Sequence, residues 1–337
     1  MVTMRDVARR ADVSIATVSF TVNNSKTVSP ATRARVEQAM EELGFRRNMV
    51  ARALASRRTR VIALLYPALQ QRLSGTAVKF FTSAAKTAGD LGYTLVLWPV
   101  SNDAEQVTQL TSGGLVDGVL LMQVQLDDPR VDRLVETGTP FAMIGRTRDP
   151  SGLTFVDIDS ENTTVAALDY LTGLGHRRIA LLTSDGDSAV PHFGPTERTR
   201  ATYLVEMGRR GLDPVMLECG ETPQAGRLAA DELYARAPET TAVMVLNENA
   251  AFGLLNGLRH LGVSVPGDMS ILSVGSSPDI AAIADPALTL MVSPADELGR
   301  MGVEALVDRL EGREERGNHT LVMCAFHEGS STAPPRR

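Results

Sequence analysis

Several common features are scarce or missing in this chain of 337 residues. Its two cysteines, Cys219 and Cys324, lie far apart without CxxC or Cys/His spacing, so we expect buried thiols rather than a disulfide or a zinc site. No apolar run reaches the roughly 18 residues that a membrane-spanning helix needs. The N-terminus also lacks the charged-then-apolar pattern of an export signal. We therefore expect a cytoplasmic protein with no membrane partner.

The motifs of the common enzyme classes are also missing. The sequence contains no GxSxG, P-loop, HExxH or paired Cys/His set, and Gly275, Ser276 and Ser277 lack the flanking glycine of a nucleophile elbow. No residue stands out as a catalytic group or as a ligand for a metal. The sequence therefore predicts a protein that is not an enzyme and that holds no cofactor or metal.

Charge is distributed unevenly along the chain. Residues 1–60 carry twelve Lys/Arg against five Asp/Glu, a balance of +7, whereas the remaining residues carry 22 against 35, a balance of −13. The hydrophobic content of 43% is high enough for the longer segment to bury one or two cores. A basic N-terminal segment on an acidic body indicates a polyanionic partner for that segment alone.

Two short helices joined by a tight turn are predicted at the start of the chain. Thr3 is a suitable N-cap for the first helix, and Asp6 completes a capping box with aspartate in place of glutamate. Ser14 is a suitable N-cap for the second helix, and Val13 with Val18 has the spacing of a hydrophobic staple. This arrangement predicts a helix-turn-helix.

A third helix is predicted to close a small core over the first two. Ser29 and Pro30 are an N-cap followed by proline at the first helical position, and Gly44 ends the apolar repeat. That repeat consists of Val36, Ala39, Met40 and Leu43. From these signals alone, a three-helix bundle that binds nothing remains the alternative to DNA binding.

These segments carry a resemblance. MRDVARRADVSIATVS, VNNSKTVSPATRARVEQAMEELGF and RNMVARALASRRT are similar, nearly position by position over about 60 residues, to the N-terminal domain of the lactose-repressor (LacI) family of bacterial transcription regulators. The resemblance implies a helix-turn-helix DNA-binding domain over residues 1–46 and a hinge helix with its linker over residues 47–60.

The resemblance also implies particular DNA contacts. Residues 14–23 would form the recognition helix in the major groove, with Ile15, Ala16 and Phe20 facing base edges. In the hinge helix, Leu54 would wedge between central base pairs from the minor groove, and Ala51 would let paired helices approach closely. The positions that would contact phosphates are Thr3, Ser14, Thr17, Ser19, Asn23, Val28 and Asn48.

Phe20 departs from the family pattern. Arginine is usual at this position, where its guanidinium can pair with guanine N7 and O6. Phenylalanine cannot form that pair, and Ile15 and Ala16 are also apolar. One hypothesis is a surface suited to thymine methyl groups, and hence an operator whose half-sites differ from the family norm at that base. The alternative is that Phe20 packs inward and that specificity comes from the hinge and from DNA shape.

From Val61 onward, short apolar strands alternate with amphipathic helices. This pattern predicts parallel sheets covered by helices on both faces, in two similar α/β lobes. The predicted strands are VIALLY, YTLVLW, GVLLM and FAMIG in the first set, and RIALLT, TAVMVL and MSILSV in the second.

The resemblance covers nearly the whole of this segment. PFAMIGR, VDIDSENTTVAALDYLTGLGHRRIALLT, GVSVPGDMSIL, DPALTLMVSPADELGRMGVEAL and EGSSTAPP are similar to family landmarks in order and spacing. It implies a two-lobe, periplasmic-binding-protein-like core over residues 61–332, with lobes crossing near residues 160 and 290. It further implies a small-molecule effector between the lobes and a homodimer contact along the core.

The expected effector site departs from the family at several positions. The resemblance places other family residues at these positions: Asn at Ser160, Arg at about Thr199, Asp-Glu at Glu248 and Asn249, and Gly-Phe-Asp-Asp at the stretch 273–276. The effector-binding residues expected from the resemblance are Tyr66, Arg146, Asp159, Phe193, Arg200, Asn247 and Ser276. Because partners of sugar hydroxyls have changed, three hypotheses stay open: a less polar or differently charged metabolite, a sugar or sugar derivative held by substitutes such as Arg146, Arg200 and Ser276, or no effector.

The aromatic side chains near the expected site have an alternative role. Tyr66, Trp98, His192 and Phe193 can line the site, or they can be packed residues at strand ends. Overall, we predict a homodimeric transcription regulator that binds a pseudo-palindromic operator and responds to an effector. We expect it to act as a repressor. The alternative function is a cytoplasmic solute-binding protein, or an effector-independent regulator whose cleft no longer binds a sugar.

Overall fold

The computed structural model describes residues 2–23, 27–45, 58–67, 75–100, 103–184, 190, 192–313 and 318–336. The chain divides into two compact units, Met1–Thr59 and Arg60–Arg337. Most of the predicted hinge helix, including Asn48, Ala51 and Leu54, lies outside the described residues.

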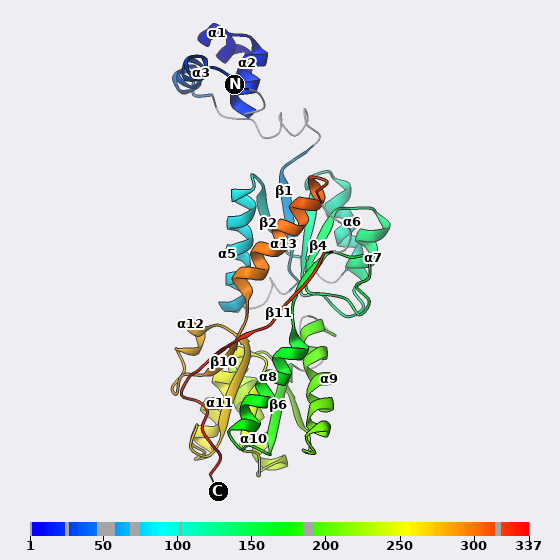
Figure 1. Cartoon of the computed structure of the whole chain (residues 1–337), viewed down its shortest axis with the longest axis vertical. Coiled ribbons are helices and arrows are strands. Elements are labelled where there is room, and N and C mark those ends of the chain that lie inside the picture. The colour runs from blue at the N-terminus through cyan, green and yellow to red at the C-terminus, as the bar shows by residue number, and fades with distance from the viewer. Residues whose placement is uncertain are drawn as a thin grey trace. The chain divides into compact units, whose positions relative to one another are not determined.

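The smaller unit contains the three predicted helices, α1 (Met4–Ala11), α2 (Ile15–Asn23) and α3 (Pro30–Glu42) (Figure 1). The predicted caps are confirmed. Thr3 Oγ1 accepts the Asp6 N–H while the Asp6 carboxylate accepts the Thr3 N–H at 3.0 Å, which completes the capping box. Ser14 and Ser29 accept the N–H groups of the residues three positions later, at 3.0 and 3.2 Å.

The core of this unit is built from small and β-branched side chains. An ion pair between Arg10 and Glu42 joins α1 to α3 at the surface. Because α2 buries Val18 and Val22 in this core, its opposite face is left for solvent or a partner. The buried residues are Val7, Ala8, Ala11, Val18, Val22, Val36 and Ala39.

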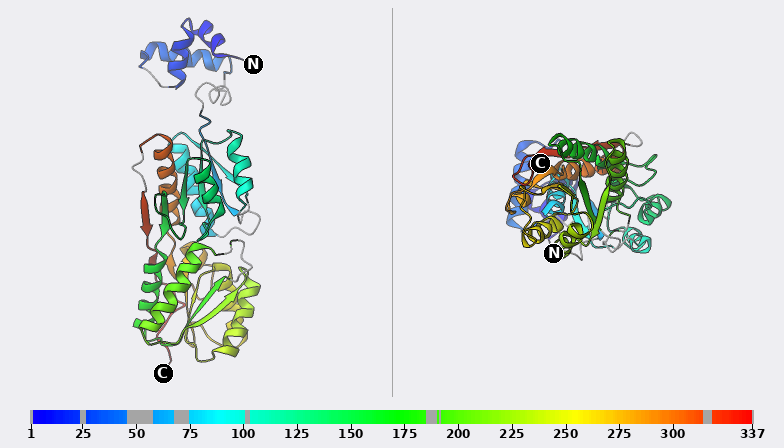
Figure 2. Two further views of the ribbon diagram at one scale, coloured as in Figure 1. Left: turned by 90° about the vertical axis from the view of Figure 1, so that its right-hand side faces the viewer. Right: turned by 90° about the horizontal axis from the view of Figure 1, so that it is seen from below.

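Within the described residues, the larger unit contains two six-stranded sheets (Figures 1 and 2). The first sheet is parallel throughout. Helices α5 (Gly75–Asp90) and α13 (Ala295–Leu310) pack on one face, and α6 (Ala104–Ser112) and α7 (Pro129–Glu136) pack on the other. The strand order is β11 (His319–Val322), β5 (Phe155–Ile158), β4 (Phe141–Ile144), β3 (Gly118–Met122), β1 (Val61–Leu65) and β2 (Thr94–Trp98).

The second sheet is parallel except for its edge strand β12, which runs antiparallel to β10. Helices α10 (Pro223–Arg236) and α11 (Glu248–His260) cover one face, and α8 (Ser160–Gly173) and α9 (Gly194–Arg209) cover the other. The strand order is β12 (Ala325–His327), β10 (Thr289–Val292), β9 (Ser270–Ser276), β8 (Ala242–Val245), β6 (Ile179–Ser184) and β7 (Val215–Cys219).

All seven predicted strands are confirmed, and the described residues contain five further strands that were not predicted: β5, β7, β10, β11 and β12. Six of the seven confirmed strands are buried on both faces of their sheets, which gives continuous apolar runs, and the seventh, β2, is a partly exposed edge strand. Among the missed strands, β10 is also mostly buried, whereas the others have interrupted or exposed patterns. Asp157 interrupts the apolar pattern of β5, and β11 and β12 are short, partly exposed edge strands.

The chain passes between the two sheets three times. It leaves the first sheet after β5, returns after β10, and passes again between β11 and β12. The third passage was not predicted. It contains Cys324, whose N–H donates to Thr163 Oγ1 at 3.1 Å and whose burial raises the pKa of its thiol to about 12.

Both cysteines are buried thiols, as predicted. Among the described residues, no group of His, Cys, Asp and Glu side chains is placed to hold a metal ion. No helix in the described part of the chain is both long and apolar enough to cross a membrane.

A fully buried ion pair shapes the loop between β3 and α7. Asp128 caps α7 by accepting the Arg130 N–H at 3.0 Å, and it also accepts the Gln125 N–H at 3.0 Å. The Arg130 guanidinium donates to Asp128 and to the carbonyls of Met122 and Gln123. Neither side chain of the pair has any exposed surface. Because the loop that it shapes contacts the second lobe at Gln125, the pair fixes part of the border between the lobes.

Replacing one member of this pair should strongly destabilise the larger unit. We expect Asp128→Ala to lower the free energy of unfolding by about 3–5 kcal/mol, because Arg130 would be left as a buried charge without its carboxylate. Urea unfolding of the full chain measures the change. The neighbouring Asp127→Ala is the control, since Asp127 pairs with Arg148 at an exposed position. Equal losses in the two variants would contradict this assignment.

Candidate DNA-binding surface and ligand site

The first turn of α2 presents an apolar surface. Ile15 is 46% exposed and Ala16 is also exposed, whereas Val18 and Val22 are buried. Phe20, one turn further along, is half-buried. The side chains at the start of α2 therefore carry no charge, and the exposed ones at positions 15 and 16 have no hydrogen-bonding group.

The predicted phosphate contacts lie at helix starts and along α2. Thr3 and Ser14 are exposed caps, and Ser14 Oγ lies 2.9 Å from Thr17 Oγ1. Thr17, Ser19 and Val28 are half-buried. Asn23 ends α2, but its side chain is outside the described part of the structure.

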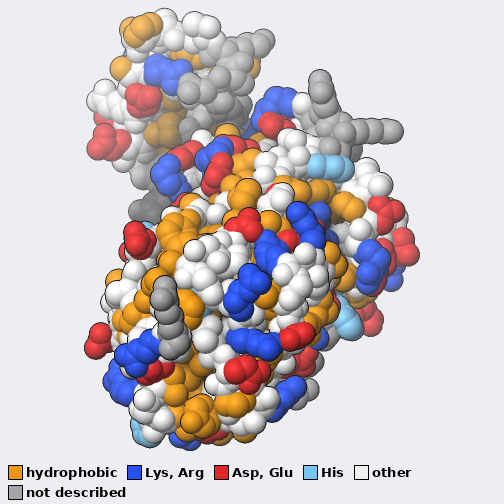
Figure 3. All heavy atoms as spheres, turned by 60° about the horizontal axis from the view of Figure 1, so that its bottom comes forward, with side chains coloured by type: hydrophobic (Ala, Val, Ile, Leu, Met, Phe, Trp, Pro, Cys, Tyr) orange, Lys and Arg blue, Asp and Glu red, His pale blue; other side chains and the backbone are white. Residues whose placement is uncertain are grey.

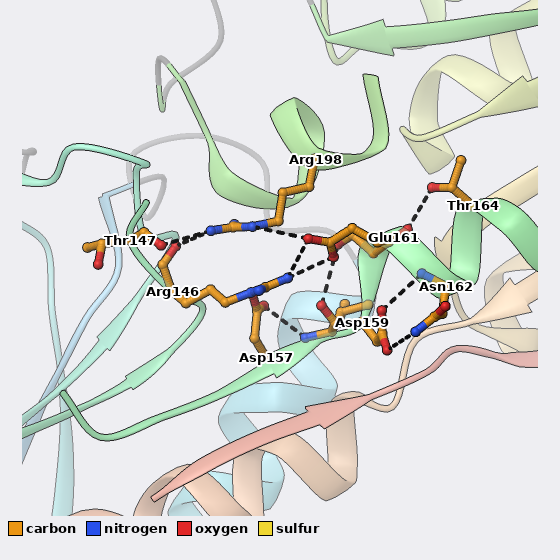
Figure 4. Close-up of polar contacts among 10 residues, drawn as sticks. Arg146, Thr147, Asp157, Asp159, Glu161, Asn162, Thr164 and Arg198 are labelled. Atoms are coloured by element: carbon orange, nitrogen blue, oxygen red, sulfur yellow. Dashed lines mark hydrogen bonds and ion pairs between the residues drawn. The ribbon is translucent and has the colours of Figure 1, made fainter. Parts of the chain in front are cut away.

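In the larger unit, two arginines and two acids form a cluster that joins the lobes (Figure 4). Arg146 follows β4, Asp157 lies on β5, Glu161 lies in the first turn of α8, and Arg198 lies on α9. Arg146 Nε donates to Asp157 Oδ2 at 3.1 Å, and its Nη2 donates to both Glu161 oxygens at 2.8 and 2.7 Å. We refer to these four residues as the arginine cluster.

Arg198 contributes the second lobe's cation to this cluster. Its Nη2 donates to the carbonyls of Arg146 and Thr147 at 3.1 and 2.9 Å, and its Nε lies 3.8 Å from Glu161 Oε1. Its Nη1 is buried and has no hydrogen-bond partner among the described residues. Gly194 permits this approach, because a Cβ there would lie 2.4 Å from Arg198 Nη1.

The electrostatics of the arginine cluster are set by burial. Burial raises the pKa of Asp157 to about 6, although Arg198 and Arg146 both act to lower it. Burial likewise lowers the pKa of Arg198, and the nearby Arg146 charge lowers it further. With both acids ionised the cluster is neutral, and it gains one positive charge as the pH falls through the pKa of Asp157.

The other predicted effector residues have structural partners. Asp159 and Asn247 cap α8 and α11 by accepting the N–H groups of Asn162 and Ala250, each at 2.9 Å. Arg200 pairs with Glu218 on β7 at 2.6 Å, so the structure does not bring it to Arg146. The arginine that lies beside Arg146 is Arg198.

Three further predicted residues lie near the border between the lobes. Tyr66 is 7% exposed and packs edge-to-face on Phe81, and burial, with a contribution from Glu221 and Glu248, raises its pKa to about 12. Phe193 forms an antiparallel bridge with Gln125 of the first lobe. Ser276 donates to Glu248 Oε2 at 3.0 Å. Of the other aromatic candidates, Trp98 is half-buried and the His192 side chain is 79% exposed.

Four polar residues at this border were missed by the sequence analysis as site residues: Asp157, Glu161, Arg198 and Glu248. One signal was present for Asp157, because an acid within an apolar strand must find a partner when the strand is buried. The others lie on helices, where the sequence alone does not show which side faces the neighbouring lobe.

The surface of the larger unit does not resemble a site for a polyanion on the face drawn in Figure 3. Lys and Arg side chains there are interspersed with Asp and Glu and with hydrophobic side chains. This agrees with the charge balance along the chain, in which the excess of basic residues is confined to the first 60 positions.

Comparison with known proteins identifies both units. Residues 3–48 match the model of the lacI family of bacterial regulatory proteins. Residues 168–332 match a periplasmic binding protein-like domain.

Several curated relatives match along almost their entire length. The HTH-type transcriptional regulator CelR of Thermobifida fusca is 33% identical over 324 residues, which cover 92% of each chain. The HTH-type transcriptional repressor CytR of Escherichia coli strain K12 is 28% identical over 340 residues, covering 99% of this chain and 97% of CytR.

Solved structures show the same architecture. A complex of the transcriptional regulator CelR with cellobiose superposes with a TM-score of 0.73 at 27% identity, covering 98% of this chain and all of that one. The lac repressor dimer bound to operator and an anti-inducer superposes with a TM-score of 0.84 at 24% identity, covering 98% and 99%. The chain therefore belongs to the lacI family of bacterial regulatory proteins, and it is a DNA-binding transcriptional regulator and not an enzyme.

Proposed function

We propose that this protein is a repressor that binds a pseudo-palindromic operator as a homodimer and whose operator affinity depends on a small effector held between the core lobes. The observation that carries the DNA-binding part is the exposed first turn of α2 in a compact, basic helix-turn-helix unit. The CytR repressor and the lac repressor dimer on its operator support the mode of action. Because the target is DNA, we place the protein in the cytoplasm.

The DNA contacts follow from the exposed residues of the smaller unit. We propose that Ile15 and Ala16 contact bases in the major groove, where apolar side chains favour the methyl group of thymine. Phe20 is half-buried, so it joins this surface through one part of its ring. Thr3, Ser14, Thr17, Ser19, Asn23 and Val28 would face phosphates. The roles of Asn48, Ala51 and Leu54 stay predictions from the sequence.

The effector site is proposed at the arginine cluster. Its guanidinium donors and carboxylate acceptors alternate across the border between the lobes, an arrangement that suits a ligand with several hydroxyl groups. The unpartnered Nη1 of Arg198 supplies a donor for such a ligand. The CelR–cellobiose complex supports a sugar or sugar derivative as the class of effector. Tyr66, Phe193, Asn247, Asp159 and Ser276 would surround the ligand or hold the groups that bind it.

Selection from a random pool of double-stranded oligonucleotides tests the proposed function. We expect a retained palindrome whose affinity falls steeply with salt, because phosphate neutralisation releases counterions. For about 6–10 phosphate contacts, the affinity should drop on the order of 10³–10⁵-fold between about 50 and 200 mM salt. A chain lacking the first 59 residues is the control and should retain nothing. Retention without sequence preference, or a flat salt response, would count against an operator-binding repressor.

A substitution on α2 tests the base contact. Phe20→Arg should shift the preferred base at one symmetric position of each half-site toward guanine, because a guanidinium pairs with guanine N7 and O6 with a discrimination of about 1–3 kcal/mol. The same selection measures the shift. Gln38→Arg is the matched control, because it adds an equal charge at an exposed position of α3 and should leave the preferred bases unchanged. An unchanged half-site in Phe20→Arg would mean that Phe20 does not face a base.

Two arginines on α9 allow a matched test of the effector site. A thermal-shift screen of sugars on the full chain identifies a ligand, and calorimetry then measures its affinity. Arg198→Met should weaken that ligand about tenfold or more, because a charged donor to a buried hydroxyl is lost. Arg200→Met is the control and should bind as the unaltered chain does, since Arg200 pairs with Glu218. The reverse result would place the ligand beside Arg200.

A further inference from the structure

The carboxylate of Glu248 joins the two lobes. Glu248 is the first residue of α11 in the second lobe, and it is 8% exposed. Its Oε2 accepts from Ser276 Oγ of the same lobe at 3.0 Å and from Thr76 Oγ1 of the first lobe at 3.2 Å. Its Oε1 accepts from the backbone N–H of Gly75 at 2.9 Å. A single side chain thus holds three donors from both sides of the border.

The place where this carboxylate lies favours a negative charge. Gly75 and Thr76 begin α5, a helix of 16 residues. The N-terminus of a helix presents N–H groups without intrahelical partners and carries a partial positive charge, so it stabilises an anion. The carboxylate of Glu248 fills that position from the opposite lobe.

Helix α12 (Pro278–Ala281) lies beside the start of α5, where Glu248 binds (Figure 1). A Cβ on Gly75 would come within 2.5 Å of the Ile280 side chain of α12. Lys79 of α5 pairs with Asp279 of α12 at 2.7 Å, at the exposed rim. A side chain at position 75 would therefore force the Ile280 side chain of α12 to move.

Other contacts between the lobes in the described residues are of two kinds. Gln125 and Phe193 form a bridge between backbones, and Arg198 donates to two backbone carbonyls of the first lobe. The pairs Arg146–Glu161 and Lys79–Asp279 are ion pairs between side chains. Arg198 also belongs to the arginine cluster, where a ligand is proposed. Glu248 differs from both kinds because its side-chain carboxylate accepts from uncharged donors at the start of α5.

We propose that Glu248 is a positioning residue that stabilises this arrangement of the lobes before any effector binds. A contact made in one arrangement of the lobes and lost in another biases the equilibrium between them by its own free energy. If the DNA-competent state requires one arrangement of the lobes, operator affinity depends on Glu248, a residue outside the helix-turn-helix unit. The link to DNA rests on the function proposed above, whereas the bridge itself does not.

Hydrogen exchange of the full-length protein measures the bridge directly. In Glu248→Gln, the loss of the charged acceptor should speed amide exchange in peptides that cover the first turn of α5 by about tenfold. Thr76→Val, which removes one donor at nearly constant volume, should show a smaller increase in the same peptides. Glu232→Gln is the control, because Glu232 pairs with Arg236 within α10 and contributes nothing to the border. Unchanged exchange in both test variants would overturn the bridge.

Operator affinity then tests the link to DNA binding. The affinity of Glu248→Gln for the selected operator should change by about tenfold relative to both the unaltered chain and Glu232→Gln. In the double variant with Thr76→Val, the two changes should be non-additive, because both act on one bridge. A general loss of stability would instead give additive effects and faster exchange throughout the second lobe, and would overturn the proposal.

The two failures can be told apart. If the unaltered chain selects no operator, the repressor function is wrong, while exchange at α5 still reports on the bridge. If exchange at α5 rises in Glu248→Gln and operator affinity stays the same, the role of Glu248 in controlling DNA binding is overturned.

Discussion

The larger unit depends on one constraint, which is that the chain passes three times between the two sheets. Along the chain, helix α13 of the first lobe follows β10 of the second sheet. Strand β11 then adds to the edge of the first sheet and β12 to the edge of the second. Neither lobe can therefore be completed without the other. The passages also place the carboxyl ends of the parallel strands of both sheets at a shared border, where α/β sheets usually bind ligands.

The groups at that border divide into two sets with different electrostatics. The arginine cluster is neutral when its acids are ionised, and burial raises the pKa of one of them, Asp157, to about 6. The carboxylate of Glu248 instead accepts hydrogen bonds from two hydroxyls and from a backbone N–H at the N-terminus of a helix. Its bridge also borders α12, which lies against the start of α5.

The smaller unit shows how a familiar scaffold can carry an unusual surface. Its capping box and its small apolar core place α2 in the usual way, with Val18 and Val22 buried. The side chains left outside at the start of that helix are Ile15 and Ala16. Because these side chains have no hydrogen-bonding groups, they can recognise only shape and methyl groups. The residues that build the three-helix scaffold are therefore different from the residues that would set its specificity for DNA.

Local signals in the sequence were enough to determine the helix starts at Thr3, Ser14 and Ser29 and the strands buried on both faces, because caps and continuous apolar runs act over a few residues. They did not determine β5, because its Asp157 is paired by Arg146, which follows the neighbouring strand β4.

Nor did local signals decide between Arg198 and Arg200. Side chains two positions apart on a helix are rotated by about 200° around its axis, so they lie on nearly opposite sides, and only packing shows which of them faces the other lobe. Likewise, Glu248 gained its role from a helix start that is 173 positions away. The sequence by itself determined the capped helices, most of the buried strands and the family. Tertiary structure decided which polar side chains meet, because that depends on the passages between the sheets and not on neighbours in the chain.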